Sequence, residues 1–172
     1  MRIPPAPVDG PDADAEAVAR IRELRTGRIS TLYRTLLHAG NVAAAWCGLG
    51  TAIRWETSLD ERTRELVTCL VAALFDADYE WANHAPLAER AGVAPEQLAA
   101  LPQWRDAGFD AGDEAVLAFA EAVATGTVDD AVFDRASATL DRRVLVEVAA
   151  TAAYYVAVGR FLDAFEVGAA DA

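Results

Sequence analysis

The residues of this sequence that are best suited to chemistry lie between Arg64 and Pro86, where two glutamates and a histidine occur among apolar residues. Glu80 and His84 are four positions apart, so on a helix their side chains project from the same face. Glu65 lies on the apolar segment before them. Carboxylates and an imidazole beside apolar surface can transfer protons near neutral pH without a metal or an organic cofactor. We therefore expect Glu65, Glu80 and His84 to form a catalytic centre.

Each of these residues also has a purely structural interpretation. His84 could be a core histidine whose hydrogen-bond partner is Glu80. Glu65 could pair with Arg62 or Arg64 on the first turn of its helix. A carboxylate close to apolar surface can instead have a raised pKa and exchange protons. The proline two positions after His84 predicts a kink or a break in the helix directly beside the imidazole.

Candidates for substrate binding are the aromatic side chains and the arginines near these residues. The aromatic residues that could line a pocket are Trp46, Trp55, Tyr79, Trp81, Tyr154 and Tyr155. Aromatic residues at helical spacing more often belong to the core than to a ligand site. From this group we select Trp55, Tyr79 and Trp81 as candidate substrate contacts. Arg62 is the candidate for binding an anionic group, with Arg54 as the alternative.

The spacing of the potential ligands predicts no metal site. A di-iron bundle needs a glutamate and a histidine at i,i+3, and a zincin needs two histidines at i,i+4. This chain has one E-x-x-x-H and only two histidines. The second, His38, is expected near a helix end, where it would interact with the helix dipole. Since the sequence also has no glycine-rich phosphate loop and no G-x-S-x-G elbow, we expect no metal and no cofactor.

Charge and hydropathy restrict the partners. A formal charge of −12 argues against nucleic acid and anionic membranes, because the field of the protein repels phosphate. No uninterrupted run reaches the ~18 apolar residues of a membrane span, and the proline-rich start lacks the apolar core of a secretory signal. Cys47 and Cys69 have neither redox nor metal spacing and are expected to be buried thiols in a reducing compartment. We expect a soluble cytoplasmic protein that acts on a small molecule.

The elements that position these residues are predicted to be helices throughout. Apolar residues recur at helical spacing, and no segment alternates with a period of two. Residues 1–11 contain four prolines and are expected to be irregular. Residues 12–172 are expected to form one all-α domain with about seven to nine helices. The expected helices cover residues 12 or 14 to 26, 30–38, 42–55, 60–75, 76 or 78 to 91, 95–101, 113–125, 128–140 and 141–167.

Residue types at the expected helix starts predict specific caps. Asn41 is expected to cap the third helix, and Ser58 with Glu61 forms an S-x-x-E capping box for the fourth. Asp76 or Asp78 is expected to cap the helix that carries His84.

The final helix is apolar nearly all round in its middle. A helix of this kind is buried, either in the domain core or at a subunit interface. Its single glutamate there, Glu147, is expected to pair with Arg143 or Arg160, or to face an interface.

The segment around the candidate site resembles the carboxymuconolactone decarboxylase and alkylhydroperoxidase D-like (AhpD-like) superfamily. The family pattern is a glutamate in R-E-L, twelve residues to the first cysteine of a C-x-x-C, and a histidine four beyond the second cysteine. Glu65 and His84 match the glutamate and the histidine, whereas Ala77 and Glu80 stand at the two cysteine positions. The stretches LYRTLLHAGNVAAAW, HAPLAERAGV and YYVAVGRFLDAF extend the resemblance over roughly residues 30–166.

The resemblance implies an AhpD-like helical bundle that forms a homo-oligomer, a trimer or hexamer or else a dimer. In the peroxidase branch two thiols reduce peroxide and cycle through a disulfide, which needs a thiolate nucleophile. The decarboxylase branch is implied to lack this pair and to transfer protons with carboxylates and a histidine. His84 would then return a proton to carbon, Glu80 would orient the imidazole, and Glu65 would act through it or through water.

These implications favour a cofactor-independent decarboxylase, lyase or isomerase that acts on a small anionic or cyclic metabolite. Two alternatives stay open. One is an alkylhydroperoxidase-type antioxidant protein that uses Cys69 or Cys47, which the missing C-x-x-C disfavours. The other is a non-catalytic helical binding protein that has kept only the fold.

Overall fold

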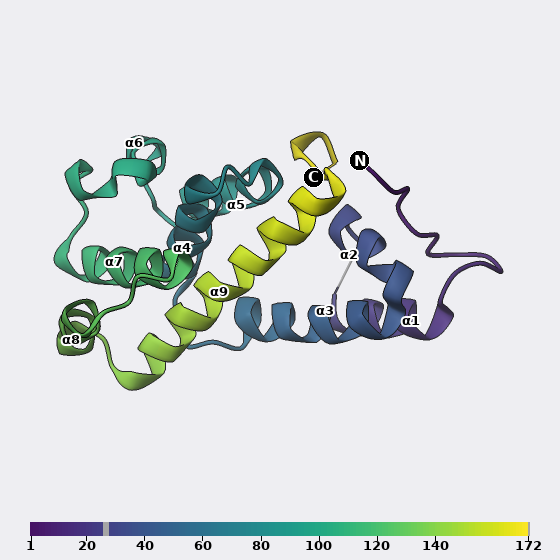
Figure 1. Cartoon of the computed structure of the whole chain (residues 1–172), viewed down its shortest axis with the longest axis horizontal. Helices are drawn as coiled ribbons and strands as arrows, with labels where there is room; N and C mark the ends of the chain where they lie inside the picture. Colours follow the sequence, from purple (N-terminus) through teal and green to yellow (C-terminus); the bar gives the residue numbers. More distant parts are fainter. Residues whose placement is uncertain (26–27, 172) are drawn as a thin grey trace.

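Every regular element in the described part of the chain, residues 1–25 and 28–171 of the computed structural model, is a helix (Figure 1). The α-helices are α1 (Ala15–Leu24), α2 (Thr31–Leu36), α3 (Gly40–Trp55), α4 (Glu61–Leu74), α5 (Asp78–Arg90), α6 (Pro95–Ala99), α7 (Ala111–Thr125), α8 (Asp130–Thr139) and α9 (Arg142–Phe165). Short 3-10 helices are η1 (Leu37–Ala39), η2 (Leu101–Asp106) and η3 (Ala169–Asp171). The all-α prediction is confirmed. Helix α1 ends at Leu24, and the predicted stop at Thr26 and Gly27 lies outside the described residues.

Helix α9 runs diagonally through the molecule and joins its two halves (Figure 1). It packs against α4 and α7 on one side and against α3 on the other. Helix α4 also packs against α5, and its side chains from Arg64 to Ala72 are buried. The apolar centre of α9 is therefore a core surface of this chain, one of the two environments expected for it.

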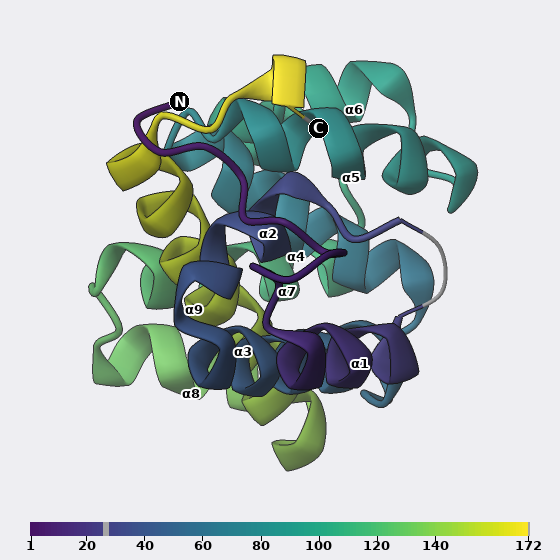
Figure 2. The same ribbon diagram turned by 90° about the vertical axis from the view of Figure 1, so that its right-hand side faces the viewer.

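The N-terminal segment is irregular up to α1 but is attached to the rest of the fold. The backbone N–H of Arg2 donates to the carbonyl of Phe165 (2.8 Å), and that of Ala6 donates to the carbonyl of Arg34 (2.9 Å). The ring of His38 binds the carbonyl of Pro4 (2.9 Å). His38 lies in the last turn of η1, near a helix end as expected, and its ring also ties the N-terminal segment down. Figure 2 shows this segment passing α2 on its way from the C-terminal end of the chain to α1.

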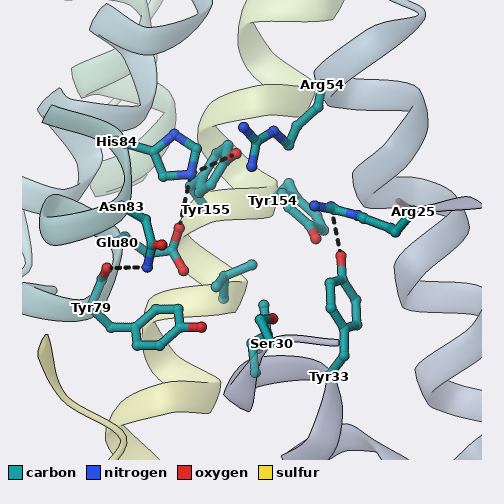
Figure 3. Close-up of a pocket in the computed structure, with 12 residues that line it drawn as sticks. Arg25, Ser30, Tyr33, Arg54, Tyr79, Glu80, Asn83, His84, Tyr154 and Tyr155 are labelled. Carbon is teal, nitrogen blue, oxygen red and sulfur yellow. Dashed lines mark hydrogen bonds and ion pairs between the residues drawn. The ribbon is translucent and has the colours of Figure 1, made fainter. Parts of the chain in front are cut away.

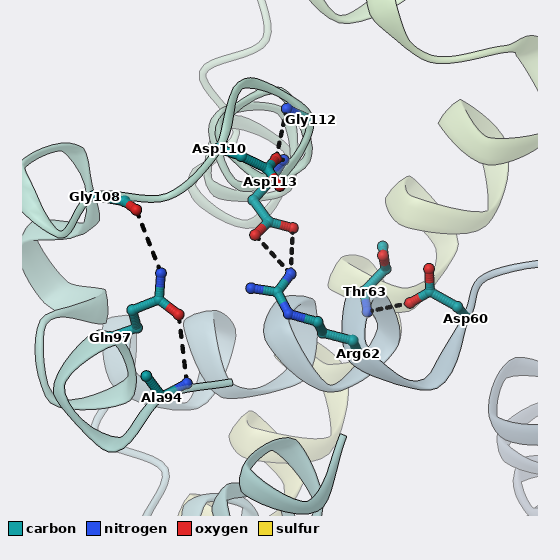
Figure 4. Close-up of polar contacts among 9 residues, drawn as sticks. All are labelled: Asp60, Arg62, Thr63, Ala94, Gln97, Gly108, Asp110, Gly112 and Asp113. Atoms are coloured by element: carbon teal, nitrogen blue, oxygen red, sulfur yellow. Dashed lines mark hydrogen bonds and ion pairs between the residues drawn. The ribbon is translucent and has the colours of Figure 1, made fainter. Parts of the chain in front are cut away.

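The predicted capping box of α4 is wrong. Helix α4 begins at Glu61, which makes Glu61 its first residue rather than its third. Asp60 caps the helix by accepting a hydrogen bond from the N–H of Thr63 (2.7 Å; Figure 4). Ser58 instead donates its N–H (2.8 Å) and its hydroxyl (2.6 Å) to Glu147 of α9. Glu147 also pairs with Arg143 (2.9 Å), one of its two predicted partners.

The predicted caps of α3 and α5 are also wrong. Neither helix has a side-chain cap, because Ala39 and Ala77 occupy the N-cap positions. Helix α3 begins at Gly40, where a Cβ atom would collide with side chains of α1 and its N-cap. Its start is therefore set by close packing rather than by the amide of Asn41.

Helix α5 continues through Pro86 to Arg90, so the predicted break beside His84 does not occur. The proline leaves the carbonyl of Ala82 without its usual intrahelical donor. His84 and Ala88, on either side of the proline, are both buried in the core. Tertiary packing of this face holds the helix together across the proline.

Two stretches, Thr31–Trp55 and Arg142–Phe165, are long and apolar enough to cross a membrane when judged by length and composition alone. The expectation of no span, based on uninterrupted apolar runs, did not detect them. The first stretch is divided among α2, η1 and α3, and the second is α9, which packs against α4 and α7. Buried core helices of soluble proteins have the same length and composition.

Candidate active site

The packing of α4 against α5 brings Glu65 and His84 into direct contact. Oε2 of Glu65 lies 2.6 Å from Nδ1 of His84, and both side chains are almost fully buried, with 1% and 3% of their surface exposed. The other carboxylate oxygen of Glu65 lies 3.4 Å from Nε of Arg64. Because Nδ1 of His84 donates to the Glu65 carboxylate, this contact fixes the orientation of the imidazole ring.

The second ring nitrogen of His84 faces two other groups. Nε2 lies 3.3 Å from the hydroxyl of Tyr155 on α9 and 3.3 Å from Oε2 of Glu80 (Figure 3). The Tyr155 ring also packs edge-on against the imidazole, with 5.0 Å between ring centroids. The shorter of the two carboxylate contacts to the imidazole is thus that of Glu65, whereas the family resemblance implies that Glu80 orients the ring. Glu80 shares the opposite nitrogen with Tyr155.

Opposing effects set the protonation of this pair. Burial lowers the pKa of His84, but hydrogen bonds to Glu65 and Glu80 outweigh it and raise the pKa above its ordinary value. Burial raises the pKa of Glu65, but the hydrogen bond to His84 and the charges of His84, Arg54 and Arg64 lower it overall. Both shifts favour the charged forms, an imidazolium beside the carboxylate of Glu65. Such a group can donate a proton and then take one back.

A cavity of about 150 Å³ lies beside these residues. Its lining comes from α2, α3, α5, α9 and the segments next to α1 and α2: Arg25, Ser30, Leu32, Tyr33, Arg54, Tyr79, Glu80, Asn83, His84, Tyr154, Tyr155 and Val158. Glu65 does not line it and lies behind the imidazole. A ligand in the cavity would therefore meet the Glu80 side of His84.

Of the four residues predicted from the sequence to contact substrate, one lines the cavity and three lie elsewhere in the molecule. Tyr79 lines the cavity, whereas Trp55, Trp81 and Arg62 do not. Trp55 is 62% exposed on the surface. The guanidinium of Arg62 binds both carboxylate oxygens of Asp113 on α7 at 2.6 Å (Figure 4). Arg62 precedes Glu65 by three positions on α4 but is directed toward a different helix.

Among the other lining residues, sequence reasoning gives some little weight and misses six: Arg25, Ser30, Leu32, Tyr33, Asn83 and Val158. Arg54, Tyr154 and Tyr155 line the cavity, in agreement with their place among the wider set of candidates. Arg25 and Tyr33 are missed, because they belong to the N-terminal part of the chain, far from the motif. The only local signal for Arg25 is its position at the end of α1, which does not reveal what it faces.

The two cysteines are buried and have no disulfide. Burial raises the pKa of the Cys69 thiol, and the negative charges of Glu65 and Glu80 raise it further. A thiol of this kind stays protonated and is a poor nucleophile. Among the described residues there is no group of three or more histidine, cysteine or acidic side chains placed to hold a metal ion.

Comparison with known proteins relates this site to one family. The sequence model of the carboxymuconolactone decarboxylase family matches residues 40–125, half of the chain, and includes Glu65, Glu80 and His84. No match is found among curated proteins.

Solved structures share the fold. A peroxidase-related protein from Ralstonia eutropha JMP134, described as an alkylhydroperoxidase AhpD core, has a TM-score of 0.80 at 18% identity, over 96% of this chain and 90% of the other. A peroxidase-related protein from Silicibacter sp. TM1040 has a TM-score of 0.76 at 17% identity, over 93% and 87%. The debrominase Bmp8, in a variant complexed with 2,3,4-tribromopyrrole, has a TM-score of 0.72 at 18% identity, over 88% and 82%.

Proposed function

Because the chain belongs to the carboxymuconolactone decarboxylase family, within the AhpD-like superfamily, we propose that it is a cofactor-independent acid/base enzyme. It acts on a small anionic or cyclic metabolite as a decarboxylase, another lyase or an isomerase. The observation that supports this most is the 2.6 Å contact between Glu65 and Nδ1 of His84, which leaves Nε2 on the side of Glu80 and Tyr155. Both of these residues line the cavity.

The proposed mechanism uses His84 as the group that carries the proton. A carbanion forms on the substrate when a proton or carbon dioxide leaves a carbon atom. The electron pair delocalises into a neighbouring carbonyl, and Nε2–H of His84 then delivers a proton to carbon. Glu65 remains ionised and stabilises the imidazolium from the Nδ1 side.

Glu80 has a separate role in this proposal. Its carboxylate lies 3.3 Å from Nε2, so a substrate must replace or share that contact before it can receive the proton. Glu80 can take a proton from a substrate carbon, or return one to Nε2 of His84 after turnover. The Tyr155 hydroxyl, whose pKa burial raises, stays neutral and serves as a hydrogen-bond donor.

A peroxidase function is disfavoured by the residues themselves. Ala77 and Glu80 stand where the redox thiols of the family pattern would be, and Cys69 is buried behind the site with a raised pKa. A thiolate is the nucleophile that peroxide reduction requires. A purely binding role would use the same cavity but would not depend on the proton affinity of His84.

Solvent deuterium exchange across a panel of candidate substrates tests the proposed function. The protein is incubated in D₂O with small unsaturated carboxylates and lactones, and ¹H NMR follows deuterium incorporation and loss of carbon dioxide. We expect His84→Gln to slow the reaction by about 100-fold or more. His38→Gln is the matched control, because the ring of His38 binds the Pro4 carbonyl and does not line the cavity. Equal rates for the His84→Gln variant and the unmodified protein would contradict the proposal and favour a binding protein.

We further propose that the protein works as a cytoplasmic homo-oligomer. Leu49 and Trp55 on α3 and Val146 on α9 are large apolar side chains with more than half of their surface exposed, which a second copy could cover. A trimer or hexamer is expected, with a dimer as the alternative. Size-exclusion chromatography with light scattering tests this, and a monomer would contradict it.

A further inference from the structure

Two arginines reach the same cavity from the side opposite His84. Arg25 follows α1 and Arg54 belongs to α3, and both line the cavity. Figure 3 shows both guanidinium groups extending from these elements toward the tyrosines of α9. The Nε atom of each arginine is buried and has no hydrogen-bond partner among the described residues. Buried donors without acceptors are unfavourable, so the arrangement points to a ligand that supplies them.

Aromatic contacts hold both guanidinium groups in place. Arg25 donates to the hydroxyl of Tyr33 (2.8 Å), and its guanidinium carbon lies 5.0 Å from the centre of that ring. The guanidinium of Arg54 lies 5.0 Å from the centre of the Trp55 ring. Since each arginine has five donors in a planar fork, most remain available to an oxyanion. Trp55 therefore positions Arg54 from outside the cavity.

The charges on the cavity wall indicate how many negative charges a ligand carries. Among the described lining residues, Arg25 and Arg54 are positive and Glu80 is negative. The buried pair of His84 and Glu65 contributes no net charge, whether the shared proton lies on the imidazole or on the carboxyl group, and Arg64, which lies 3.4 Å from the other oxygen of Glu65, does not line the cavity. One positive charge is left over, and one monoanion neutralises it. A carboxylate fits this requirement, whereas a phosphate monoester carries about −1.5 to −2 near pH 7.

We propose that the substrate is a compact monocarboxylate, and that Arg25 and Arg54 bind its carboxylate. This inference rests on the proposed acid/base function and defines its substrate class. An apolar cavity of about 150 Å³ in another protein holds benzene, so the ligand body is about the size of a six-membered ring. Binding at the arginines would leave the rest of such a ligand beside Glu80 and His84.

The bound carboxylate is retained in the reaction. Ion pairs with arginine stabilise a carboxylate more than the departing, neutral carbon dioxide, so they would raise the barrier to its loss. The reaction that fits is a proton shift. The Glu80 carboxylate removes a proton from one carbon, the electron pair moves into a conjugated system, Nε2–H of His84 delivers a proton to another carbon, and Glu80 then returns its proton to Nε2. No atoms or electrons are gained or lost, so no co-reactant is needed.

Binding of benzoate tests the arginine site independently of turnover. Isothermal titration calorimetry compares benzoate with benzamide, its neutral analogue, and with inorganic phosphate. We expect benzoate to bind at least about tenfold more tightly than either. Arg25→Gln and Arg54→Gln should each weaken benzoate binding by about tenfold or more, without changing the affinity for benzamide. Arg20→Gln, which removes an exposed charge from α1, is the matched control and should stay within about twofold of the unmodified protein.

Other outcomes overturn the inference. These are equal affinity for benzoate and benzamide, tighter binding of phosphate, no benzoate binding by the folded protein, or normal benzoate binding in both arginine variants. Because Arg25 also holds Tyr33, Arg25→Lys and a circular dichroism spectrum separate loss of charge from loss of fold. Arg25→Lys should recover part of the affinity. His84→Gln should still bind benzoate, so failure of the proposed catalysis is distinguishable from failure of the arginine site.

Discussion

Nδ1 of His84 lies 2.6 Å from the carboxylate of Glu65, although the two residues are 19 positions apart in the chain. The contact joins α4 to α5 in the interior of the protein and leaves Nε2 of the imidazole beside Glu80 and Tyr155. The same carboxylate satisfies the buried ring and, by raising the pKa of His84, favours its positive charge.

The stability that this pair provides depends on pH in both directions. His84 has a raised pKa in the folded protein, so its contribution is complete below about pH 6.5 and is lost as pH rises through the raised value. Glu65 has a lowered pKa, so its contribution is complete above about pH 4.3 and is lost as pH falls through the lowered value. The free energy of unfolding, measured with urea, should therefore differ most between the unmodified protein and His84→Gln at pH values between about 4.3 and 6.5. A difference that grows from pH 6 to pH 9 would contradict the assignment.

Removal of the buried carboxylate should affect stability and activity together. Glu65→Gln leaves the imidazole without its charged partner, and we expect a loss of about 1–3 kcal/mol in the free energy of unfolding. Turnover should fall by about 100-fold or more in the same variant. Glu61→Gln, at an exposed position on the same helix, is the control and should change stability by less than about 0.5 kcal/mol. Unchanged turnover in Glu65→Gln would mean that this carboxylate is structural only.

Arg62 should be dispensable for activity. Its guanidinium binds Asp113 on α7 and does not reach the cavity. Because the Arg62 side chain is 30% exposed, we expect Arg62→Gln to lower the free energy of unfolding by about 1 kcal/mol or less, with turnover unchanged. A double-mutant cycle with Asp113→Asn measures the pair directly. A rise in KM in Arg62→Gln would show instead that this residue contacts the substrate.

The thiols should take no part in the reaction. Both cysteines are fully buried, and the pKa of Cys69 is raised. We expect the variant carrying Cys47→Ala and Cys69→Ala to keep its acid/base turnover, and the unmodified protein to keep both thiols when treated with alkyl hydroperoxide. Thiol titration before and after peroxide checks this. Peroxide turnover that disappears in Cys69→Ser would support the antioxidant alternative.

The sequence is sufficient to predict the fold class and to group His84 with the two glutamates that contact its imidazole. Helical periodicity is local, and the spacing of Glu80 and His84 places both on one face of α5 wherever the helix begins. Tyr155 joins them only because α9 packs against α4, with 71 positions separating it from His84. The structure places Arg62 at Asp113 rather than at the cavity, because closeness to Glu65 in sequence does not reveal which neighbouring helix a side chain faces. The cap predicted at Ser58 is misplaced because the aspartate two positions later satisfies the helix start directly.

The central claim is that Glu65 holds His84 as the protonated group of the site. An NMR titration of protein labelled with ¹⁵N-histidine measures this directly, because only His38 and His84 contribute signals and His84→Gln assigns them. We predict that His84 stays protonated above pH 6.5, and that Glu65→Gln lowers its pKa. A His84 signal that titrates below pH 6.5, or one that Glu65→Gln leaves unmoved, would contradict the account.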